Sequence, residues 1–277
     1  MCLDEMKLPL YHVDAFASEV FCGNPAAVCP LDTWLPDATL QNIAAENNLS
    51  ETAFTVRRGN DFDLRWFTPT MEVDLCGHAT LAAAFVLFME NGVEASSIRF
   101  HSRSGWLAVS CDAGLLTLDF PSLPATSCKA SESLARGLGA KPREILKARD
   151  YLAVFNSEAE VRGLKPDFGA LRSLDCLGVI ATARGGDCDF VSRFFAPAAG
   201  IDEDPVTGSA HCTLIPYWAE QLGKTKLLAR QVSARGGELV CEHVGDRVRI
   251  GGRAVLFSRG EIHLLNHGSP RWDQRRN

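Results

Sequence analysis

The sequence predicts an α+β protein of two similar lobes, in which short strands surround one apolar helix in each lobe. Three observations predict it: an internal repeat, a nearly constant interval between the glycines of the two copies, and a strand–loop–helix–strand order in each copy. The 277 residues, of which 46% are hydrophobic and 22% charged, suffice for two modest cores.

The repeat relates residues 64–88 to residues 192–218. Both segments contain, in the same order, an arginine, two aromatic residues, Thr or Ala, a proline, a short acidic loop, Gly-x-Ala and an apolar stretch. The match continues downstream, because residues 103–107 resemble residues 235–239. Glycine-bearing units of this kind also occur by chance in α/β proteins, so a true duplication requires that the two copies share one topology.

The glycines of the two copies are spaced alike. Gly77 precedes Gly105 by 28 positions, and Gly208 precedes Gly237 by 29. Gly77 and Gly208 each stand where an apolar helix begins. Because nearly all residues of these helices are apolar, we expect each helix at the centre of its lobe.

The elements follow in chain order. In the first copy the strand Leu64–Thr68 leads to the helix Ala79–Glu90, and in the second the strand Phe190–Ala196 leads to the helix Ala210–Leu222. Each helix ends at a turn that contains glycine. Alternating or β-branched runs predict further strands at 11–16, 26–29, 53–57, 106–111, 115–120, 176–181, 247–250, 254–258 and 261–265.

The lobes are expected to meet near residue 124, where the chain is rich in Pro and Ser. This places the N-terminal lobe at 1–124 and the C-terminal lobe at 125–265, with a surface helix over Ser131–Leu138. The last residues, 266–277, contain three arginines without periodicity and predict a flexible tail.

Composition favours a small-molecule partner. The net charge of −6 and the pI near 5.7 give no overall positive field for nucleic acid or an anionic membrane. No signal peptide and no apolar run of 18 residues is evident, so we expect a cytoplasmic protein, and a homodimer is plausible by base rate. The ten cysteines lie far apart without a CxxC pair, which is typical of buried hydrophobic residues.

Two helices that begin at glycines of duplicated lobes suggest a cleft between the lobes. Both helix N-termini would direct free N–H groups and positive dipole ends at one anion, so the expected substrate carries a carboxylate. The G-x-G-x-x-G and Walker patterns are absent, which disfavours nicotinamide and ATP chemistry.

Four features of the sequence could carry chemistry. Glu51 precedes an apolar strand, where a glutamate serves equally as a turn or cap residue. His78 at a helix start can shuttle protons near pH 7, or can simply bond to its own loop. The acids before Thr207 are favoured by the helix dipole alone, and they lack a metal-binding spacing. Cys76 at a helix N-terminus could have a lowered pKa and act as a base or nucleophile.

The repeat tests the role of Cys76. Aligning the two loop glycines places Thr207 opposite Cys76, with Pro205 close by, so the second copy offers no thiol for a symmetrical two-base racemase. A hydrolase is also disfavoured, because Ser209 and His211 lie two apart on a predicted helix and G-x-S-x-G is absent.

Five motifs resemble one family. They lie at 21–28, 48–54, 64–84, 200–211 and 234–239, and they resemble the phenazine-biosynthesis-like isomerase family (PhzF-like proteins) of the diaminopimelate epimerase superfamily. The resemblance spans residues 8 to 265, and the second half is similar to the mammalian phenazine-biosynthesis-like domain proteins. It implies two pseudo-twofold lobes, each a β-barrel-like sheet around a central helix, with the active site between them.

The resemblance also implies the site. The proton-transferring glutamate of the family corresponds to Glu51, and its neighbours correspond to His78, Asp204 and Ser209. Residues of the same motifs that are expected to bind substrate are Asn24, Gly77, Ala79, Thr207 and Gly208. No cofactor or metal is implied.

The leading hypothesis is a cofactor-independent isomerase that moves a proton on a small carboxylate-bearing substrate, with Glu51 as the shuttle. Because a solvated glutamate with a pKa near 4.3 is a weak shuttle at neutral pH, we expect burial or the neighbouring Asp204 to raise the pKa of Glu51. The alternatives are an epimerase or racemase that uses Cys76, and a binding protein without turnover.

Overall fold

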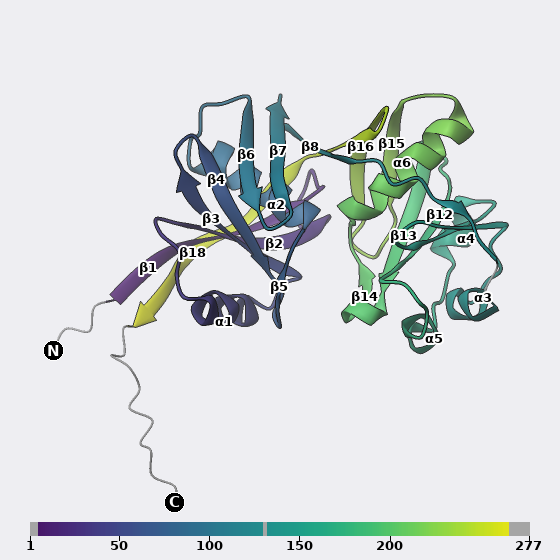
Figure 1. The fold of residues 1–277 in the computed structure, drawn as a ribbon, viewed down its shortest axis with the longest axis horizontal. Helices are drawn as coiled ribbons and strands as arrows, with labels where there is room; N and C mark the ends of the chain where they lie inside the picture. The colour runs from purple at the N-terminus through teal and green to yellow at the C-terminus, as the bar shows by residue number, and fades with distance from the viewer. Residues whose placement is uncertain (1–4, 130–131, 266–277) are drawn as a thin grey trace, which may run out of the picture.

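The computed structural model describes residues 5–129 and 132–265 and shows two lobes side by side (Figure 1). The predicted tail at 266–277 lies outside the described residues. The helix predicted over 131–138 is present as α3 (Glu132–Leu138), although its first predicted residue is not described. Among the described helices none combines the length and apolarity needed to cross a bilayer.

The first lobe holds a mixed sheet that surrounds α2 (Gly77–Phe85), which continues into a π-helical turn, η1 (Val86–Glu90). A second helix, α1 (Asp37–Asn47), lies on the outside of the sheet. The strands of this lobe are β1 (Glu5–Ala15), β2 (Asn24–Leu31), β3 (Glu51–Arg58), β4 (Asp61–Phe67), β5 (Glu72–Val73), β6 (Ser97–Ser102), β7 (Gly105–Asp112) and β8 (Leu115–Pro121).

The second lobe is built around α6 (Gly208–Leu222), with three short helices on its outer side (Figure 1). These are α3, α4 (Glu158–Arg162) and α5 (Phe168–Arg172), and a 3₁₀ turn, η2 (Pro197–Ala199), precedes β14. The strands are β9 (Thr126–Ser127), β10 (Glu144–Lys147), β11 (Tyr151–Val154), β12 (Val179–Arg184), β13 (Phe190–Ala196), β14 (Ile201–Asp204), β15 (Lys226–Gln231), β16 (Gly237–Val244) and β17 (Arg247–Gly252).

The two lobes share one strand topology. In the first, β2 and β3 are parallel, β3, β4 and β5 are successively antiparallel, β4 and β6 are parallel, and β6 and β7 are antiparallel. The second lobe repeats this pattern in the same order. There β11 and β12 are parallel, β12, β13 and β14 are successively antiparallel, β13 and β15 are parallel, and β15 and β16 are antiparallel. The predicted duplication is therefore confirmed at the level of topology.

The duplication extends to individual side chains. Arg65 on β4 makes a two-pronged ion pair with Glu72 on β5, with both N···O distances at 2.7 Å. Arg193 on β13 does the same with Glu203 on β14, at 2.7 and 2.8 Å. The fork of an arginine matches a carboxylate in this geometry. In both lobes the pair fixes the short strand that leads to the central helix.

One strand departs from the predicted domain division. The segments predicted as strands at 254–258 and 261–265 form one long strand, β18 (Ala254–Leu265). The sequence predicts that this segment belongs to the C-terminal lobe. It instead pairs antiparallel with β1 in the first lobe. Since β8 also pairs with β17, the sheets of the two lobes are joined by a strand pair rather than by a single linker.

Other element boundaries differ modestly from the predictions. The strand predicted at 176–181 begins three residues later, at Val179, because the chain bends at Cys176 and Leu177. β1 begins at Glu5 rather than Tyr11, because its first half pairs with β18, and Leu8 and Leu10 of this half pack in the apolar cluster beside α1.

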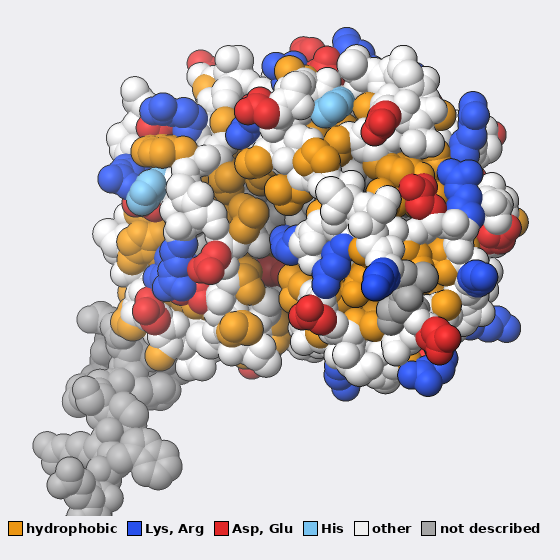
Figure 2. All heavy atoms as spheres, turned by 45° about the vertical axis from the view of Figure 1, so that its right-hand side comes forward, with side chains coloured by type: hydrophobic (Ala, Val, Ile, Leu, Met, Phe, Trp, Pro, Cys, Tyr) orange, Lys and Arg blue, Asp and Glu red, His pale blue; other side chains and the backbone are white. Residues whose placement is uncertain are grey.

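Three apolar clusters support this arrangement. The largest runs through both lobes and contains the buried faces of α2 and α6, a second lies beneath α3, α4 and α5, and a third lies between α1 and the sheet. On the face shown in Figure 2, hydrophobic side chains gather in the hollows while charges of both signs are interspersed around them.

A short loop before β2 links the lobes. The N–H of Gly23 donates to the carbonyl of Gly236 in the second lobe at 2.7 Å, and Arg235 donates to the carbonyl of Gly23 at 2.9 Å. Gly23 has a φ of +69°, and a Cβ at this position would lie 2.2 Å from the carbonyl oxygen of Ala15. This position therefore requires glycine for both its conformation and its space.

We expect Gly23→Ala to reduce the free energy of unfolding far more than Gly59→Ala. Gly59 has a similar φ of +63° but no atom within 4 Å of its hypothetical Cβ, so alanine there bears only the left-handed strain of about 1–2 kcal/mol. At Gly23 the clash adds on the order of 1–3 kcal/mol. Urea unfolding of both variants checks this difference, and equal losses would contradict the steric account.

Candidate active site

Glu51 and Asn24 lie at the same edge of the first-lobe sheet. Asn48, at φ +49°, reverses the chain after α1, and three residues later Glu51 opens β3. Asn24 opens β2, which runs parallel to β3 with Ala26 opposite Glu51. Because parallel strands begin at the same edge, both polar side chains are placed beside the start of α2.

His78 is the second residue of α2 and contacts Glu51. Its Nε2 lies 3.0 Å from Oε2 of Glu51, with 7% and 12% of the two side chains exposed. Neither atom has a hydrogen-bond partner elsewhere in the described part of the chain. Nδ1 of the same ring lies 3.6 Å from Sγ of Cys76, and the ligand atoms of Glu51, Cys76 and His78 all lie within 4.8 Å of one another. The carboxylate, the thiol and the imidazole therefore form one cluster.

Asn24 connects this group to the second lobe. Its Nδ2 donates to Oδ1 of Asp204 at 2.8 Å and to the carbonyl of Val206 at 2.9 Å, and it also lies 3.1 Å from Nδ1 of His78. An amide NH₂ has two protons, and the two oxygens accept both. The amide of Asn24 therefore does not need Nδ1 of His78 as an acceptor.

The electrostatics of the pair overturn one expectation from the sequence. Burial acts to raise the pKa of Glu51, but attraction to His78 outweighs it and holds the pKa below its usual value. Burial acts to lower the pKa of His78, but Cys76 and Glu51 outweigh it and raise that pKa well above its usual value. The predicted rise in the pKa of Glu51 is wrong, because a cation and not a carboxylate is its nearest charged neighbour.

Burial dominates at the two other ionisable groups. It raises the pKa of Asp204, although attraction to His78 and a hydrogen bond from Thr207 partly offset it. It also raises the pKa of Cys76 to about 11. The thiol of Cys76 is therefore protonated at neutral pH, contrary to the lowered pKa considered for a cysteine at a helix start.

Asp204 ends β14, and its surroundings hold it rigidly. Oδ2 accepts a hydrogen bond from Oγ1 of Thr207. The buried side chain of Gln231 accepts from the N–H of Thr207 at 2.9 Å and donates to the carbonyl of Asp204 at 2.7 Å. Sequence reasoning missed Gln231, whose only signal is a polar residue at a buried position near the end of β15.

The starts of the two central helices touch. Gly77 is the first residue of α2 and Gly208 the first of α6, and a Cβ on either would lie 3.7 Å from Cα of the other. Neither Cys76 nor Thr207, the residues that precede the helices, caps its helix with a side chain. The first N–H groups of both helices therefore remain available to an anion at this junction.

The remaining predicted residues lie in different surroundings. Oγ of Ser209, in the first turn of α6, accepts a hydrogen bond from Nη2 of Arg149 at 3.1 Å rather than contacting Glu51. Ala79 is fully buried and packs in the apolar core, so its methyl group supports the helix start. Arg149 was not singled out from the sequence, since an arginine in a loop has no distinguishing local pattern.

Three side chains of the site could hold a metal ion. The ligand atoms of Glu51, Cys76 and His78 lie within 4.8 Å of one another. Cys76, however, approaches Nδ1 of the imidazole, whereas Glu51 approaches Nε2. Each ring nitrogen thus already has a neighbour, and a structural zinc ion would need a fourth ligand in addition to these three.

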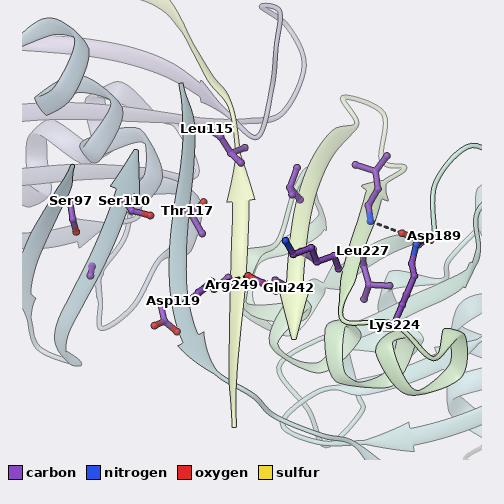
Figure 3. A pocket seen from close by; sticks show the side chains of 15 residues that line it. Ser97, Ser110, Leu115, Thr117, Asp119, Asp189, Lys224, Leu227, Glu242 and Arg249 are labelled. Carbon is purple, nitrogen blue, oxygen red and sulfur yellow. Dashed lines mark hydrogen bonds and ion pairs between the residues drawn. The ribbon is translucent and has the colours of Figure 1, made fainter. Parts of the chain in front are cut away.

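The site is distinct from a groove on the surface that has a volume of about 760 Å³. That groove lies over the strands that join the lobes, and Figure 3 shows Thr117, Arg249 and Glu242 along it, with an ion pair between Lys224 and Asp189 at its edge. Charged side chains of its walls are paired with one another, Lys224 with Asp189 and Arg249 with Glu242. The chemistry therefore points to the helix junction rather than to the groove.

Comparison with known proteins decides the family. The model of the phenazine biosynthesis-like proteins, PhzC-PhzF, matches residues 13–260. The chain belongs to this family. An uncharacterized isomerase of Pseudomonas aeruginosa is 54% identical over 260 residues, which cover 94% of this chain and 100% of the relative. A human phenazine biosynthesis-like domain-containing protein is 37% identical over 287 residues, covering 93% and 99%.

Solved structures agree with the family assignment. The crystal structure of a PhzF-family protein from Enterococcus faecalis has a TM-score of 0.92 and 53% identity, over 94% of this chain and 100% of that chain. A hydroxyproline epimerase from Agrobacterium vitis, with bound trans-4-hydroxy-L-proline, has a TM-score of 0.60 at 10% identity. The PhzF-family chain therefore has the predicted diaminopimelate-epimerase-like fold.

The stability of this PhzF-family protein should depend on pH through a second buried histidine, His211. Nδ1 of His211 in α6 lies 2.8 Å from the carbonyl of Thr207, and burial lowers the pKa of His211 to about 4. The unfolded chain takes up this proton near pH 6.5 and the folded chain does not, so stability is full above pH 6.5 and is lost as the pH falls toward 4.

The size of the effect follows from the two pKa values. At about 1.4 kcal/mol per pH unit, His211 should remove up to roughly 3 kcal/mol of the free energy of unfolding between pH 7 and pH 4. Urea unfolding of the wild type and His211→Gln over this range isolates the contribution, because the variant should have a shallower slope. Parallel curves for the two proteins would refute this account.

Proposed function

We propose that this protein is a cofactor-independent isomerase that moves one proton between two carbons of a small carboxylate-bearing substrate. The observation that carries the proposal is the contact between Glu51 and His78, with 3.0 Å between Oε2 and Nε2, beside the junction of the two helix starts. It combines one ionised carboxylate, which can accept a proton, with N–H groups that can hold an anion.

The reaction needs only the proton that it moves. Oε of Glu51 accepts a proton from a carbon of the substrate, and the electron pair of that C–H bond moves into the adjacent unsaturated system. The carboxyl group of Glu51 then returns the proton to a second carbon, which restores the carboxylate. Nothing is oxidised or reduced, so one glutamate serves as both base and acid.

His78 sets the conditions for both steps. By lowering the pKa of Glu51, it keeps the carboxylate ionised and oriented before the substrate binds. A carboxylate of lowered pKa is also a weaker base, so the C–H bond that it attacks must be acidified by conjugation with a carbonyl group or double bond. This condition favours an unsaturated substrate over a simple α-amino acid.

The site supports an epimerase less well. A two-thiol mechanism needs a second cysteine at the start of α6, and this position holds Thr207. Burial raises the pKa of Cys76 to about 11, which disfavours the thiolate that would act as a base. The 54%-identical relative from Pseudomonas aeruginosa is named an isomerase, and this name supports the same class of activity here.

Deuterium transfer tests the proposal. The wild type is incubated in heavy water with a panel of small unsaturated carboxylates, and mass spectrometry and NMR detect which acid gains deuterium and where its double bond lies. We expect Glu51→Gln to lower this turnover by at least ~10²-fold, because the amide keeps the shape but cannot carry the proton. Glu46→Gln, on the exposed face of α1 five residues earlier, serves as the matched control.

The Cys76→Ser variant separates the mechanisms. An isomerase based on Glu51 retains turnover in Cys76→Ser, whereas an epimerase based on the thiol loses it. Exchange that inverts a stereocentre without moving a double bond would indicate the epimerase. Carboxylates that bind the wild type but neither gain deuterium nor shift their double bond would indicate a binding protein without turnover.

A further inference from the structure

Gln231 is a buried polar residue at the end of β15, and it contacts the loop that carries Asp204 into the site. It is 1% exposed. Its Oε1 accepts the N–H of Thr207 at 2.9 Å, while Nε2 lies 2.7 Å from the carbonyl oxygen of Asp204 and 3.2 Å from Oγ1 of Thr207. The two protons of an amide nitrogen suffice for both of these contacts. Both polar atoms of this side chain therefore bind residues 204–207.

The equivalent position of the first lobe makes different contacts. Ser102 ends β6 as Gln231 ends β15, and the two residues pair with the equivalent glycines Gly105 and Gly237. The hydroxyl of Ser102 donates to the carbonyl of Gly105 at 2.9 Å, within its own hairpin. Among the described residues, the loop before α2 is therefore held without a counterpart of Gln231.

A simpler brace is common to both lobes. Oγ of Ser104 donates to the carbonyl of Asp74 at 2.7 Å, and Oγ of Ser233 donates to the carbonyl of Pro205 at 2.8 Å. Each of these carbonyls lies three residues before the first glycine of the central helix. Because a serine already holds the loop in both lobes, support of the loop alone does not explain the additional contacts of Gln231.

The lobes also differ at the two residues that Gln231 contacts. The last residue of the short strand is Val73 in the first lobe and Asp204 in the second. The residue before the central helix is Cys76 in the first lobe and Thr207 in the second. The amide of Gln231 thus occurs in the lobe that has the carboxylate and the hydroxyl, and the three groups bond to one another.

The amide fixes the direction of the Thr207 hydroxyl. Nε2 of Gln231 is only a donor, so Oγ1 of Thr207 accepts one of its protons and directs its own proton at Oδ2 of Asp204. In the described part of the chain no third group bonds to this hydroxyl. Hydrogen bonds that follow one another in a single direction strengthen each other. The chain from Gln231 therefore stabilises the ionised form of Asp204, which accepts at its end.

The other oxygen of Asp204 also faces a donor. Oδ1 accepts from Nδ2 of Asn24 at 2.8 Å, and the same nitrogen lies 3.1 Å from Nδ1 of His78. Burial raises the pKa of Asp204, and the carboxylate of Glu51 on β3 raises it further. The imidazole of His78 on α2 and the donors of Thr207 and Asn24 oppose this rise. The charge of Asp204 thus depends on the direction of the hydrogen bonds that reach it.

We propose that Gln231 is a positioning residue that directs the hydroxyl of Thr207 at Asp204, so that Asp204 stays ionised and holds Asn24 beside His78 during proton transfer. The proposal rests on the proposed isomerase function and adds to it a residue of β15 that acts through Thr207 and Asp204. It explains why the amide accompanies the carboxylate and the hydroxyl in only one copy of the repeat.

Titration of Asp204 tests the proposal without a substrate. Its carboxyl carbon is followed by ¹³C NMR in the full chain from neutral pH downward, and Asp204→Asn assigns the signal. Gln231→Met keeps the length of the side chain but removes the amide, so the hydroxyl of Thr207 is free to turn away. The titration midpoint of Asp204 should then rise by about one pH unit, which corresponds to the loss of one hydrogen bond to a charged group.

Two controls exclude a general loss of packing. Ser102→Ala removes a hydrogen bond at the equivalent position of the first lobe, where the residue is 7% exposed, and it should leave the midpoint of Asp204 unchanged. In a Thr207→Val background the hydroxyl is absent, so Gln231→Met should add little to the midpoint. A merely structural role of Gln231 would instead give the same shift in both backgrounds.

A second variant covers the case in which Gln231→Met does not fold. Gln231→Glu keeps an acceptor for the N–H of Thr207 and replaces the donor Nε2 with an oxygen. It should raise the midpoint of Asp204, and this shift should also be smaller in the Thr207→Val background. The difference between the two backgrounds measures the part of the shift that passes through the hydroxyl.

The outcomes separate this proposal from the proposed function. An unchanged midpoint in the Gln231 variants, or equal shifts in the two backgrounds, overturns the role of Gln231 whether or not a substrate turns over. Failure of every carboxylate to gain deuterium or shift its double bond would refute the isomerase, and the titration would still decide the role of Gln231 at Asp204.

The pH profile of deuterium transfer tests the link to turnover. The pKa of Asp204 is raised and that of Glu51 is lowered, so Asp204 is the first of the two to take up a proton as the pH falls. Gln231→Met should therefore move the acid limb of the profile upward together with the midpoint of Asp204, and Ser102→Ala should leave it in place. An acid limb that does not move in Gln231→Met overturns the role in proton transfer.

Discussion

The structure depends on the contact between the starts of α2 and α6. At Gly77 and Gly208 the two backbones approach so closely that a Cβ on either glycine would lie 3.7 Å from Cα of the other. This distance is an ordinary van der Waals contact, so the two helix starts, and with them the two lobes whose cores they form, pack directly against each other. Both helix dipoles consequently point into one small region, and the polar side chains of the site surround it.

Asn24 shows how the two lobes are coupled at this point. It belongs to the first lobe, but both of its amide protons are donated to Asp204 and Val206 of the second. The loop before it is held by Arg235, which also forms an ion pair with the buried Asp14 at 2.8 Å. The position of His78 beside Glu51 is therefore fixed by residues from both halves of the duplication. The single site needs residues of both lobes.

The sequence predicted the parts of this arrangement that depend on local pattern. The repeat located the strand β13 and the helix α6, and the motifs led to Glu51, His78 and Asp204, three residues that lie in one region of the structure. The pairing of β18 with β1 could not be predicted, because alternating apolar residues in a strand do not indicate which lobe the strand joins.

Gln231 and Arg149 could not be predicted from the sequence for a similar reason, because they form hydrogen bonds with partners more than 20 residues away. The predicted direction of the pKa shift at Glu51 is wrong. Whether the pKa of Glu51 rises or falls depends on whether His78 or Asp204 lies nearer to its carboxylate, and the spacing of these residues along the chain does not give their distances in space.

The central claim is that Glu51 and His78 form an ion pair at neutral pH. It is tested most directly by ¹⁵N NMR of the imidazole of His78 in the full-length protein at pH 7, with and without Glu51→Gln. We expect both ring nitrogens of His78 to be protonated in the wild type, and the ring to become neutral when the carboxylate is replaced by an amide. A neutral imidazole in the wild type, or a charge on His78 that is indifferent to Glu51→Gln, would contradict the account.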